Sequence, residues 1–398
     1  MQLIDRVVQF RAEIQAIRRD IHAHPELRFE ERRTSDIVAR KLAEWGLEVH
    51  RGLGGTGLVG VLANGPGKSL GLRADMDALP IQELNSFAHR STHANKMHAC
   101  GHDGHTAMLL GAAKYLAEAK SFTGTLNFIF QPGEEGGGGA KKMINDGLFE
   151  RFPCDAVFGM HNWPNLRVGQ FGFAPGPMMA GANLFEITVR GKGAHAALPH
   201  LGIDPVFAAV QIVQGLQGIL TRQRKPLDPA VMSITIIKAG DANNVVPDTA
   251  FISGTVRTFD DKVTDLIETG MRRIATLTAE AHGATAEVNF ARYYPPTVNH
   301  AAQSEFAANV AAAMVGEQNT VRDIEPAMTA EDFSFMLRER PGAYLWIGNG
   351  DGAHRESGHG AGPCMLHNAS YDFNDDLIPL GATMWVRLAE AWLAEPQR

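Results

Sequence analysis

The chain has 398 residues, of which 44% are hydrophobic and 20% charged, and its formal net charge is −7. This length exceeds one ordinary hydrophobic core and predicts two domains. The negative charge argues against a nucleic-acid surface, which needs a basic face. No apolar run approaches the roughly 18 residues of a membrane span. The start of the chain lacks signal-peptide features, and three scattered cysteines make no disulfide framework, so we expect a cytoplasmic protein.

Helical patterns alternate with short apolar runs over roughly the first 180 residues, which predicts an α/β domain with parallel strand pairs. Strands are expected at 57–63, 69–75, 125–130 and 155–160, and a helix at 106–119. Two prolines and two glycines at 173–182 predict a hinge.

A different unit is expected at 183–294. Its predicted elements follow the order βαββαβ of a ferredoxin-like fold, with strands and helices at 183–191, 203–223, 231–240, 249–259, 261–282 and 284–294. Helix and strand then alternate again, with a strand at 344–350 and a last helix at 378–394. The sequence therefore predicts a catalytic domain, 1–182 plus 295–398, with a small domain inserted at 183–294.

The segment HACGHDGH (98–105) offers metal ligands. Cys100 and His102 are one residue apart, so an extended backbone would direct both to one side. A thiolate and an imidazole together suit zinc or a similar transition metal. A buried cysteine and a capping histidine are the structural alternative. His105 should begin the next helix.

Adjacent carboxylates, Glu134 and Glu135, follow the apolar run FIFQPG. The carboxyl end of a strand is where α/β enzymes bind ligands. Neighbouring side chains diverge, so one carboxylate can bind metal while the other accepts a proton from water. A solvated acidic turn is the alternative. His161 ends another apolar run, and His367 follows a glycine-rich loop. Five ligands of mixed N, O and S type exceed one closed zinc site and suit two metal ions.

Ten sequence blocks carry a family resemblance over nearly the whole chain: RRDIHAHPEL (18–27), LRADMDALPIQE (72–83), MHACGHDGH (97–105), FQPGEEGGGGAKKMINDG (130–147), GMHNWP (159–164), GKGAHAALPH (191–200), NVVPD (244–248), AMTAEDFSF (327–335), PGAYLWIG (341–348) and LHNASYDF (366–373). In these blocks the chain resembles the M20 metallopeptidase family, within it the branch of N-acyl amino acid amidohydrolases, hippurate hydrolases and plant auxin-conjugate hydrolases.

The resemblance implies two divalent ions (Zn, Mn, Co or Ni) and hydrolysis of N-acyl amino acids. It implies five metal ligands, Cys100, His102, Glu135, His161 and His367. Glu134 is implied as general base and Asp77 as a residue that orients a ligand. More distant family members have a bridging Asp where Cys100 stands, so the bridging ligand stays open.

The inserted domain is implied as a lid and dimerisation domain. His195 is the expected donor to the oxyanion, acting across a homodimer or a dimer of dimers. Asn244 and Arg257 are expected at the substrate carboxylate, which an arginine can bind with two parallel hydrogen bonds.

Other functions compete with this one. Cys100 could be the nucleophile of a cysteine hydrolase, with His102 as base. The glycines at 52–57 match a dinucleotide-binding pattern, but a strand follows where a helix should begin. An M20-type dipeptidase or carboxypeptidase, an N-acetyl-diaminopimelate-type deacetylase and a non-catalytic binding protein also remain open.

Overall fold

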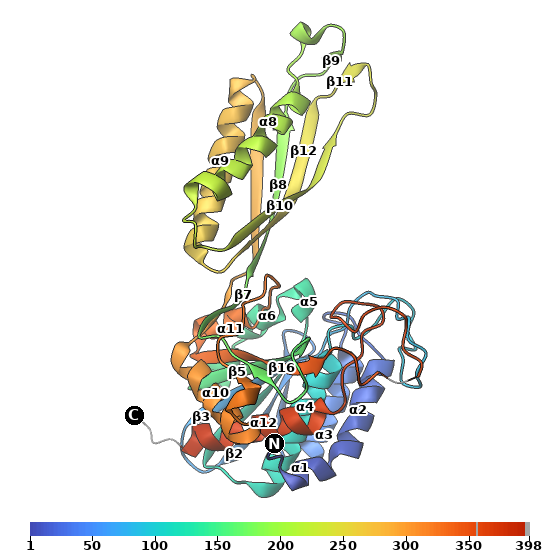
Figure 1. Ribbon diagram of the computed structural model, residues 1–398, viewed down its shortest axis with the longest axis vertical. Helices are drawn as coiled ribbons and strands as arrows, with labels where there is room; N and C mark the ends of the chain where they lie inside the picture. The colour runs from blue at the N-terminus through green and yellow to red at the C-terminus, as the bar shows by residue number, and fades with distance from the viewer. Residues whose placement is uncertain (356, 395–398) are drawn as a thin grey trace. The chain divides into compact units, whose positions relative to one another are not determined.

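The computed structural model describes residues 1–355 and 357–394. These residues form two compact units, each described by itself (Figure 1). Unit 1 comprises Met1–Met178, Val298–Glu325 and the described chain from Asp332 onward. Unit 2 comprises Met179–Thr297 and Pro326–Glu331. Among the described residues, we find no helix with the length and apolar character needed to span a membrane.

Unit 1 is built on a mixed eight-stranded sheet in the order β1-β2-β4-β3-β5-β16-β6-β15. The central strands β4, β3, β5 and β16 are parallel neighbours, whereas β1, β2 and β4 pair antiparallel. The strands are β1 (Glu48–Leu53), β2 (Gly57–Asn64), β3 (Ser69–Asp75), β4 (Gly124–Gln131), β5 (Ala156–Pro164), β6 (Phe171–Gly172), β15 (Thr320–Val321) and β16 (Gly342–Gly350). The α/β class predicted from the alternating pattern is confirmed.

Six longer or terminal helices share one hydrophobic core with this sheet: α1 (Asp5–Gln9), α2 (Arg11–Ala23), α3 (Arg32–Glu44), α4 (His102–Ala119), α10 (Ala301–Val315) and α12 (Leu377–Ala394). Shorter elements are α5 (Glu134–Gly137), α6 (Gly139–Asn145), α7 (Leu148–Arg151), α11 (Ser334–Glu339), the 3₁₀ turn η3 (Glu317–Asn319), and strands β7 (Gly176–Met179) and β14 (Thr297–Asn299). The segment 173–182, for which a hinge is expected, contains β7 and the start of β8, and its role as a hinge stays a prediction.

Helix α4 begins at His102, four residues before the predicted start. Gly101 has φ 87°, a left-handed conformation that favours glycine, and its carbonyl accepts hydrogen bonds from Gly104 and His105. The helix can therefore start at His102, directly after Gly101. His102 and His105 both lie in its first turn as a result.

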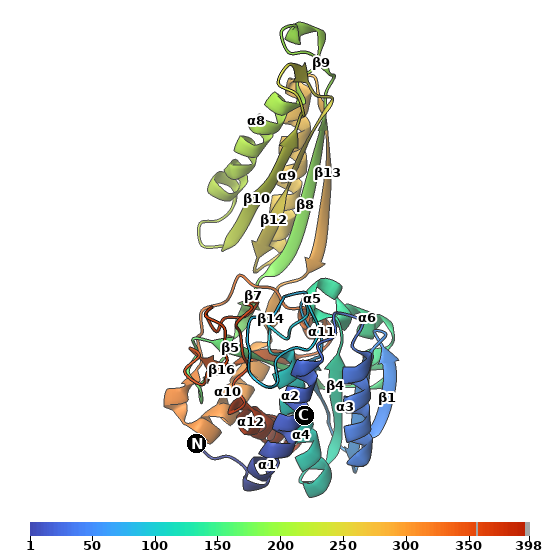
Figure 2. The same ribbon diagram turned by 90° about the vertical axis from the view of Figure 1, so that its right-hand side faces the viewer.

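Unit 2 has the predicted βαββαβ order, in an antiparallel sheet ordered β10-β12-β8-β13 (Figure 2). Its elements are β8 (Gly181–Arg190), β9 (Ala194–His195), η1 (Pro199–Leu201), α8 (Pro205–Gly218), the π turn η2 (Ile219–Gln223), β10 (Ala230–Ala239), β11 (Val245–Val246), β12 (Thr249–Thr258), α9 (Asp261–Ala281) and β13 (Thr285–Tyr294). Alternate residues of β8 are buried, because one face of the sheet packs against both helices. The boundaries 182/183 and 294/295 of an independently folding insert stay a prediction.

Candidate metal centre

The residues expected to bind metal lie at the carboxyl ends of parallel strands in unit 1. Asp75 ends β3, Glu134 follows β4 by three residues, and His161 lies near the end of β5. Because β3, β4 and β5 run parallel, their carboxyl ends meet at one edge of the sheet. Cys100 and His102 reach this edge from the start of α4.

Two overlapping groups of ligand atoms form at this edge. Ligand atoms of Cys100, His102 and His161 all lie within 4.8 Å of one another, and so do those of Cys100, Glu135 and His367. Cys100 Sγ is 3.3 Å from His161 Nε2, and His367 Nε2 is 3.2 Å from Glu135 Oε1. The structure thus brings all five expected ligands together, and Cys100 belongs to both groups. We call these five residues the ligand cluster.

The donor set of the ligand cluster fits a pair of divalent transition-metal ions. His102 Nδ1 lies 3.1 Å from Asp77 Oδ1, which leaves Nε2 facing the cluster. Among the described residues, this fully buried Nε2 has no hydrogen-bond partner. Buried polar atoms without hydrogen-bond partners are rare, and a bound metal ion would give this nitrogen a partner. Thiolate, imidazole and carboxylate together are the ligands that zinc and its neighbours accept.

Electrostatics at the ligand cluster favour a cation. Burial disfavours the charged imidazole of His102, but Asp75, Asp77 and Glu135 raise its pKa to about 10. Burial also raises the pKa of the Cys100 thiol well above its usual value, and Glu135 and Glu134 raise it further. A thiol among buried carboxylates is a poor free nucleophile, which argues against the cysteine-hydrolase alternative.

Glu134 and Glu135 lie on a tightly held turn. Gly133 has φ 62° and Gly136 has φ 73°, so the backbone changes direction on both sides of the pair. Glu135 N donates to Asp77 Oδ2 at 2.8 Å, and Arg28 Nη1 donates to the Glu135 carbonyl at 2.8 Å. These two hydrogen bonds fix the backbone of Glu135. A ligand atom of each glutamate lies within 4.8 Å of those of the other and of His102.

The loop that carries His367 is fixed by its backbone. His367 has φ 63°, an uncommon conformation for a residue with a side chain, and its N–H donates to the Ala99 carbonyl at 2.7 Å. Strained backbone of this kind concentrates at functional sites. The hydrogen bond holds His367 next to the segment that carries Cys100.

Sequence patterns gave no role to several residues that pack beside the ligand cluster. His105 Nδ1 is 2.6 Å from Asp75 Oδ1, and its Nε2 accepts from Asn162 N at 3.0 Å. The ligand atoms of Asp75, His102 and His105 also lie within 4.8 Å of one another. Because both nitrogens of His105 already have partners, it is the weaker candidate ligand. The position of Asp75, two residues before Asp77 at a strand end, was the available signal.

The residues expected at the substrate lie in unit 2 and do not all come together. His195 and Asn244 are neighbours, since β9 pairs with β11 and Ala196 N donates to the Asn244 carbonyl at 2.9 Å. Arg257 pairs with Ala182 near one end of the sheet, whereas Thr249 pairs with Arg190 at the opposite end. Strand β9 follows Arg190 along the chain. At about 3.3 Å per residue, the stretch from Thr249 to Arg257 is roughly 25 Å long. One chain therefore cannot direct both Asn244 and Arg257 to one carboxylate.

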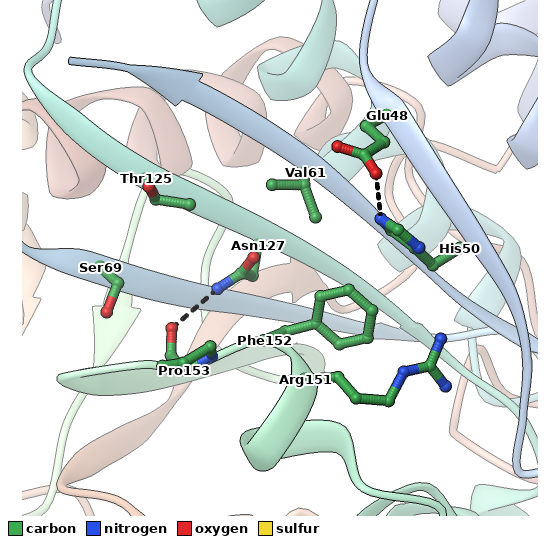
Figure 3. Close-up of a pocket in the computed structure, with 9 residues that line it drawn as sticks. All are labelled: Glu48, His50, Val61, Ser69, Thr125, Asn127, Arg151, Phe152 and Pro153. Carbon is green, nitrogen blue, oxygen red and sulfur yellow. Dashed lines mark hydrogen bonds and ion pairs between the residues drawn. The ribbon is translucent and has the colours of Figure 1, made fainter. Parts of the chain in front are cut away.

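In unit 1, a separate hollow of about 580 Å³ lies at the end of the sheet opposite to the ligand cluster (Figure 3). Ser69, the first residue of β3, and Thr125, near the start of β4, line it. Its polar groups pair with one another, for example Asn127 Nδ2 with the Pro153 carbonyl at 3.0 Å and Glu48 with His50 at 2.9 Å. No residue predicted for the site lines this hollow. The glycine-rich segment 52–57, which matches a dinucleotide-binding pattern, forms the turn between β1 and β2. The strand expected after it is β2.

An α/β sheet that brings nitrogen, oxygen and sulfur donors together at its carboxyl edge, beside two adjacent glutamates, is typical of metal-dependent hydrolases. Residues 71–391 match the pattern of peptidase family M20/M25/M40, and the chain belongs to this family.

Comparison with individual relatives shows which members of the family the chain is similar to. The chain is 42% identical to a hippurate hydrolase of Campylobacter jejuni, covering 99% of this chain and 100% of that protein. It is 40% identical to an IAA-amino acid hydrolase of Arabidopsis thaliana, covering 95% and 85%. A solved Bacillus subtilis structure, described as a dinuclear metal-binding peptidase of family M20, is 33% identical with a TM-score of 0.84, covering 98% and 99%. The chain is a metal-dependent amidohydrolase similar to the hippurate hydrolases.

Proposed function

We propose that the chain hydrolyses the amide bond of N-acyl amino acids, with hippurate-like substrates favoured, and that two divalent metal ions bind the ligand cluster. The observation that carries this proposal is the convergence of Cys100, His102, Glu135, His161 and His367 beside Glu134. The relatives support the substrate class, since one is named for hippurate and one for IAA–amino acid conjugates. The choice among Zn, Mn, Co and Ni, and the cytoplasmic location, are parts of the same proposal.

Each residue near the ligand cluster has a separate proposed task. When bound, the ions would polarise the acyl carbonyl and lower the pKa of water. Glu134, 7% exposed, accepts the proton of the attacking water and returns it to the leaving amine. Asp77 accepts a hydrogen bond from His102 Nδ1–H and so fixes the tautomer of a ligand.

Substrate recognition falls to unit 2 in this proposal. Arg257 is half-buried, and burial lowers the pKa of its guanidinium, which favours pairing with an anion. His195 and Asn244 lie at the other end of the sheet, so a second copy of the chain supplies them. His195 then donates to the developing oxyanion, Asn244 contacts the carboxylate end, and the active form is a homodimer or a dimer of dimers.

A dipeptidase, carboxypeptidase or deacetylase of the same family would use the same ligands with a different substrate. Hydrolysis of N-benzoyl-, N-acetyl- and indole-acyl amino acids, compared with dipeptides, separates these alternatives.

The two adjacent glutamates provide the decisive experiment. Glu134→Gln removes the proton acceptor, so hydrolysis should fall by about 10²-fold or more while metal content is kept. Glu135→Gln, the matched control, should lower metal content as well as activity. If Glu134→Gln instead loses both metal ions, Glu134 is a ligand and its role as base is wrong.

A further inference from the structure

The carboxyl half of β5 carries an aromatic surface beside the ligand cluster. Trp163 follows His161 by two residues, so both side chains leave the same face of the sheet. Their ring centroids are 6.4 Å apart, with the planes at 71°. Trp163 stacks on Trp346 of β16, the residue paired with His161, at 3.8 Å and 3° from parallel.

The two tryptophans differ in how much of their surface is exposed to solvent. Trp346 is 1% exposed and belongs to the packed interior, whereas Trp163 is half-buried. Trp346 therefore supports one face of the Trp163 ring and fixes its orientation. The remaining surface of Trp163 is a flat, rigid apolar face at the edge of the sheet that carries His161. Phe171 and Phe173, which follow β5 along the chain, are 0% and 1% exposed and present no such surface.

We propose that Trp163 contacts the acyl group of the substrate and makes the enzyme prefer aromatic acyl groups over acetyl. This inference rests on the proposed function, in which the scissile amide lies at the ligand cluster. The proposed carboxylate-binding residues all belong to unit 2, so the acyl end is the part of the substrate left for unit 1. A benzoyl ring can cover the indole and gain offset or edge-to-face stacking, whereas an acetyl group covers little of it.

The preference is measured as the ratio of kcat/KM for benzoyl-glycine to kcat/KM for acetyl-glycine. Trp163→Leu should lower this ratio about tenfold or more, because stacking and buried area are both lost. Trp163→Phe, which keeps a ring, should retain most of the preference. Trp45→Leu is the matched control, since Trp45 is also half-buried but lies after α3, and it should leave the ratio unchanged.

Because a ratio cancels the amount of active enzyme, partial misfolding does not imitate the expected result. If Trp163→Leu does not fold, Trp163→Met decides the matter, with the same expected fall. An unchanged ratio in a folded variant that cleaves both substrates overturns the role of Trp163 and leaves the proposed function intact. A wild-type enzyme that cleaves neither substrate overturns both.

Discussion

Cys100 and His102 of the ligand cluster, and Glu134 beside it, contact little water, whereas His367 is exposed. His102 is 0% exposed, and Cys100 and Glu134 are each 7% exposed. Charges in such surroundings are weakly screened, so the carboxylates beside His102 repel one another unless a cation lies among them. We therefore expect substitutions of single ligands to change metal affinity and activity together.

The proposed binding of the substrate carboxylate by Arg257 can be tested by substitution with lysine. Arg257→Lys keeps the charge but loses the planar fork, so KM for N-acyl amino acids should rise strongly, by about tenfold. The corresponding amino-acid amides, which lack the carboxylate, should be affected much less. Arg292→Lys is a suitable control, because Arg292 pairs with Asp265 and Glu268 on the surface of the same unit. Equal losses on both substrate types would assign Arg257 to the structure of unit 2.

Helix α2 is joined to the ligand cluster by a buried arginine. Arg18 is 0% exposed, its Nε lies 2.7 Å from Asp103 Oδ2, and its Nη2 donates to Asp372 Oδ1 at 2.9 Å. Asp103 directly follows His102, and Asp372 lies in the loop after His367. One guanidinium therefore connects α2 with both segments that carry His102 and His367. Removing one partner of such a buried pair is costly, because the other charge stays buried.

His22 of the same helix gives the protein a pH-dependent stability. Burial and Arg18 lower its pKa, but Asp103 and the bond to Glu83 raise the pKa to about 9. Its stabilisation is therefore complete below pH 6.5 and is lost as the pH rises through 9. His22→Gln should be less stable at pH 7 by on the order of 2 kcal/mol, with a flatter profile between pH 6.5 and 9.

Urea unfolding at several pH values measures this profile, and His24→Gln is the control. Nδ1 of His24 lies 2.8 Å from the carbonyl oxygen of Asp20 in the same helix. A variant at His22 that keeps the wild-type slope would place the titrating group elsewhere.

Strands and helices were predictable from sequence wherever burial on one face left a regular pattern, as in β8, β12 and α9. The edge strand β1 (Glu48–Leu53) was missed, because its exposed residues, such as Glu48 and Arg51, show no apolar alternation. His22 lies in the last turn of α2. Its ion pairs with Asp103 and Glu83 join residues more than 60 positions apart, and local patterns carry no signal for such contacts.

The geometry of the site was partly predictable in the same sense. Motifs placed Cys100, His102, Glu135 and His161 after strands or at a helix start, and the parallel sheet brings such positions together. The separation of Asn244 from Arg257 could not be read from their spacing of 13 residues. It depends on β12 running the full length of the inserted sheet between them.

That separation predicts an active site shared between two chains. A mixture of Glu134→Gln and His195→Ala chains forms some mixed dimers, each with one site that has both residues intact. Random reassembly should recover about a quarter of wild-type activity, although each parent variant is nearly inactive. Recovery no greater than that of the separate variants would show that His195 acts on its own chain or not at all.

The most direct test of the whole account is a metal titration of hydrolysis. The protein is stripped with a chelator, dialysed, and assayed on benzoyl-glycine while Zn²⁺, Mn²⁺, Co²⁺ or Ni²⁺ is added. We predict that the stripped protein is inactive and that activity returns as two ions bind per chain, with Cys100→Ala failing to reach two. Full activity in the stripped protein would contradict the metal-dependent mechanism.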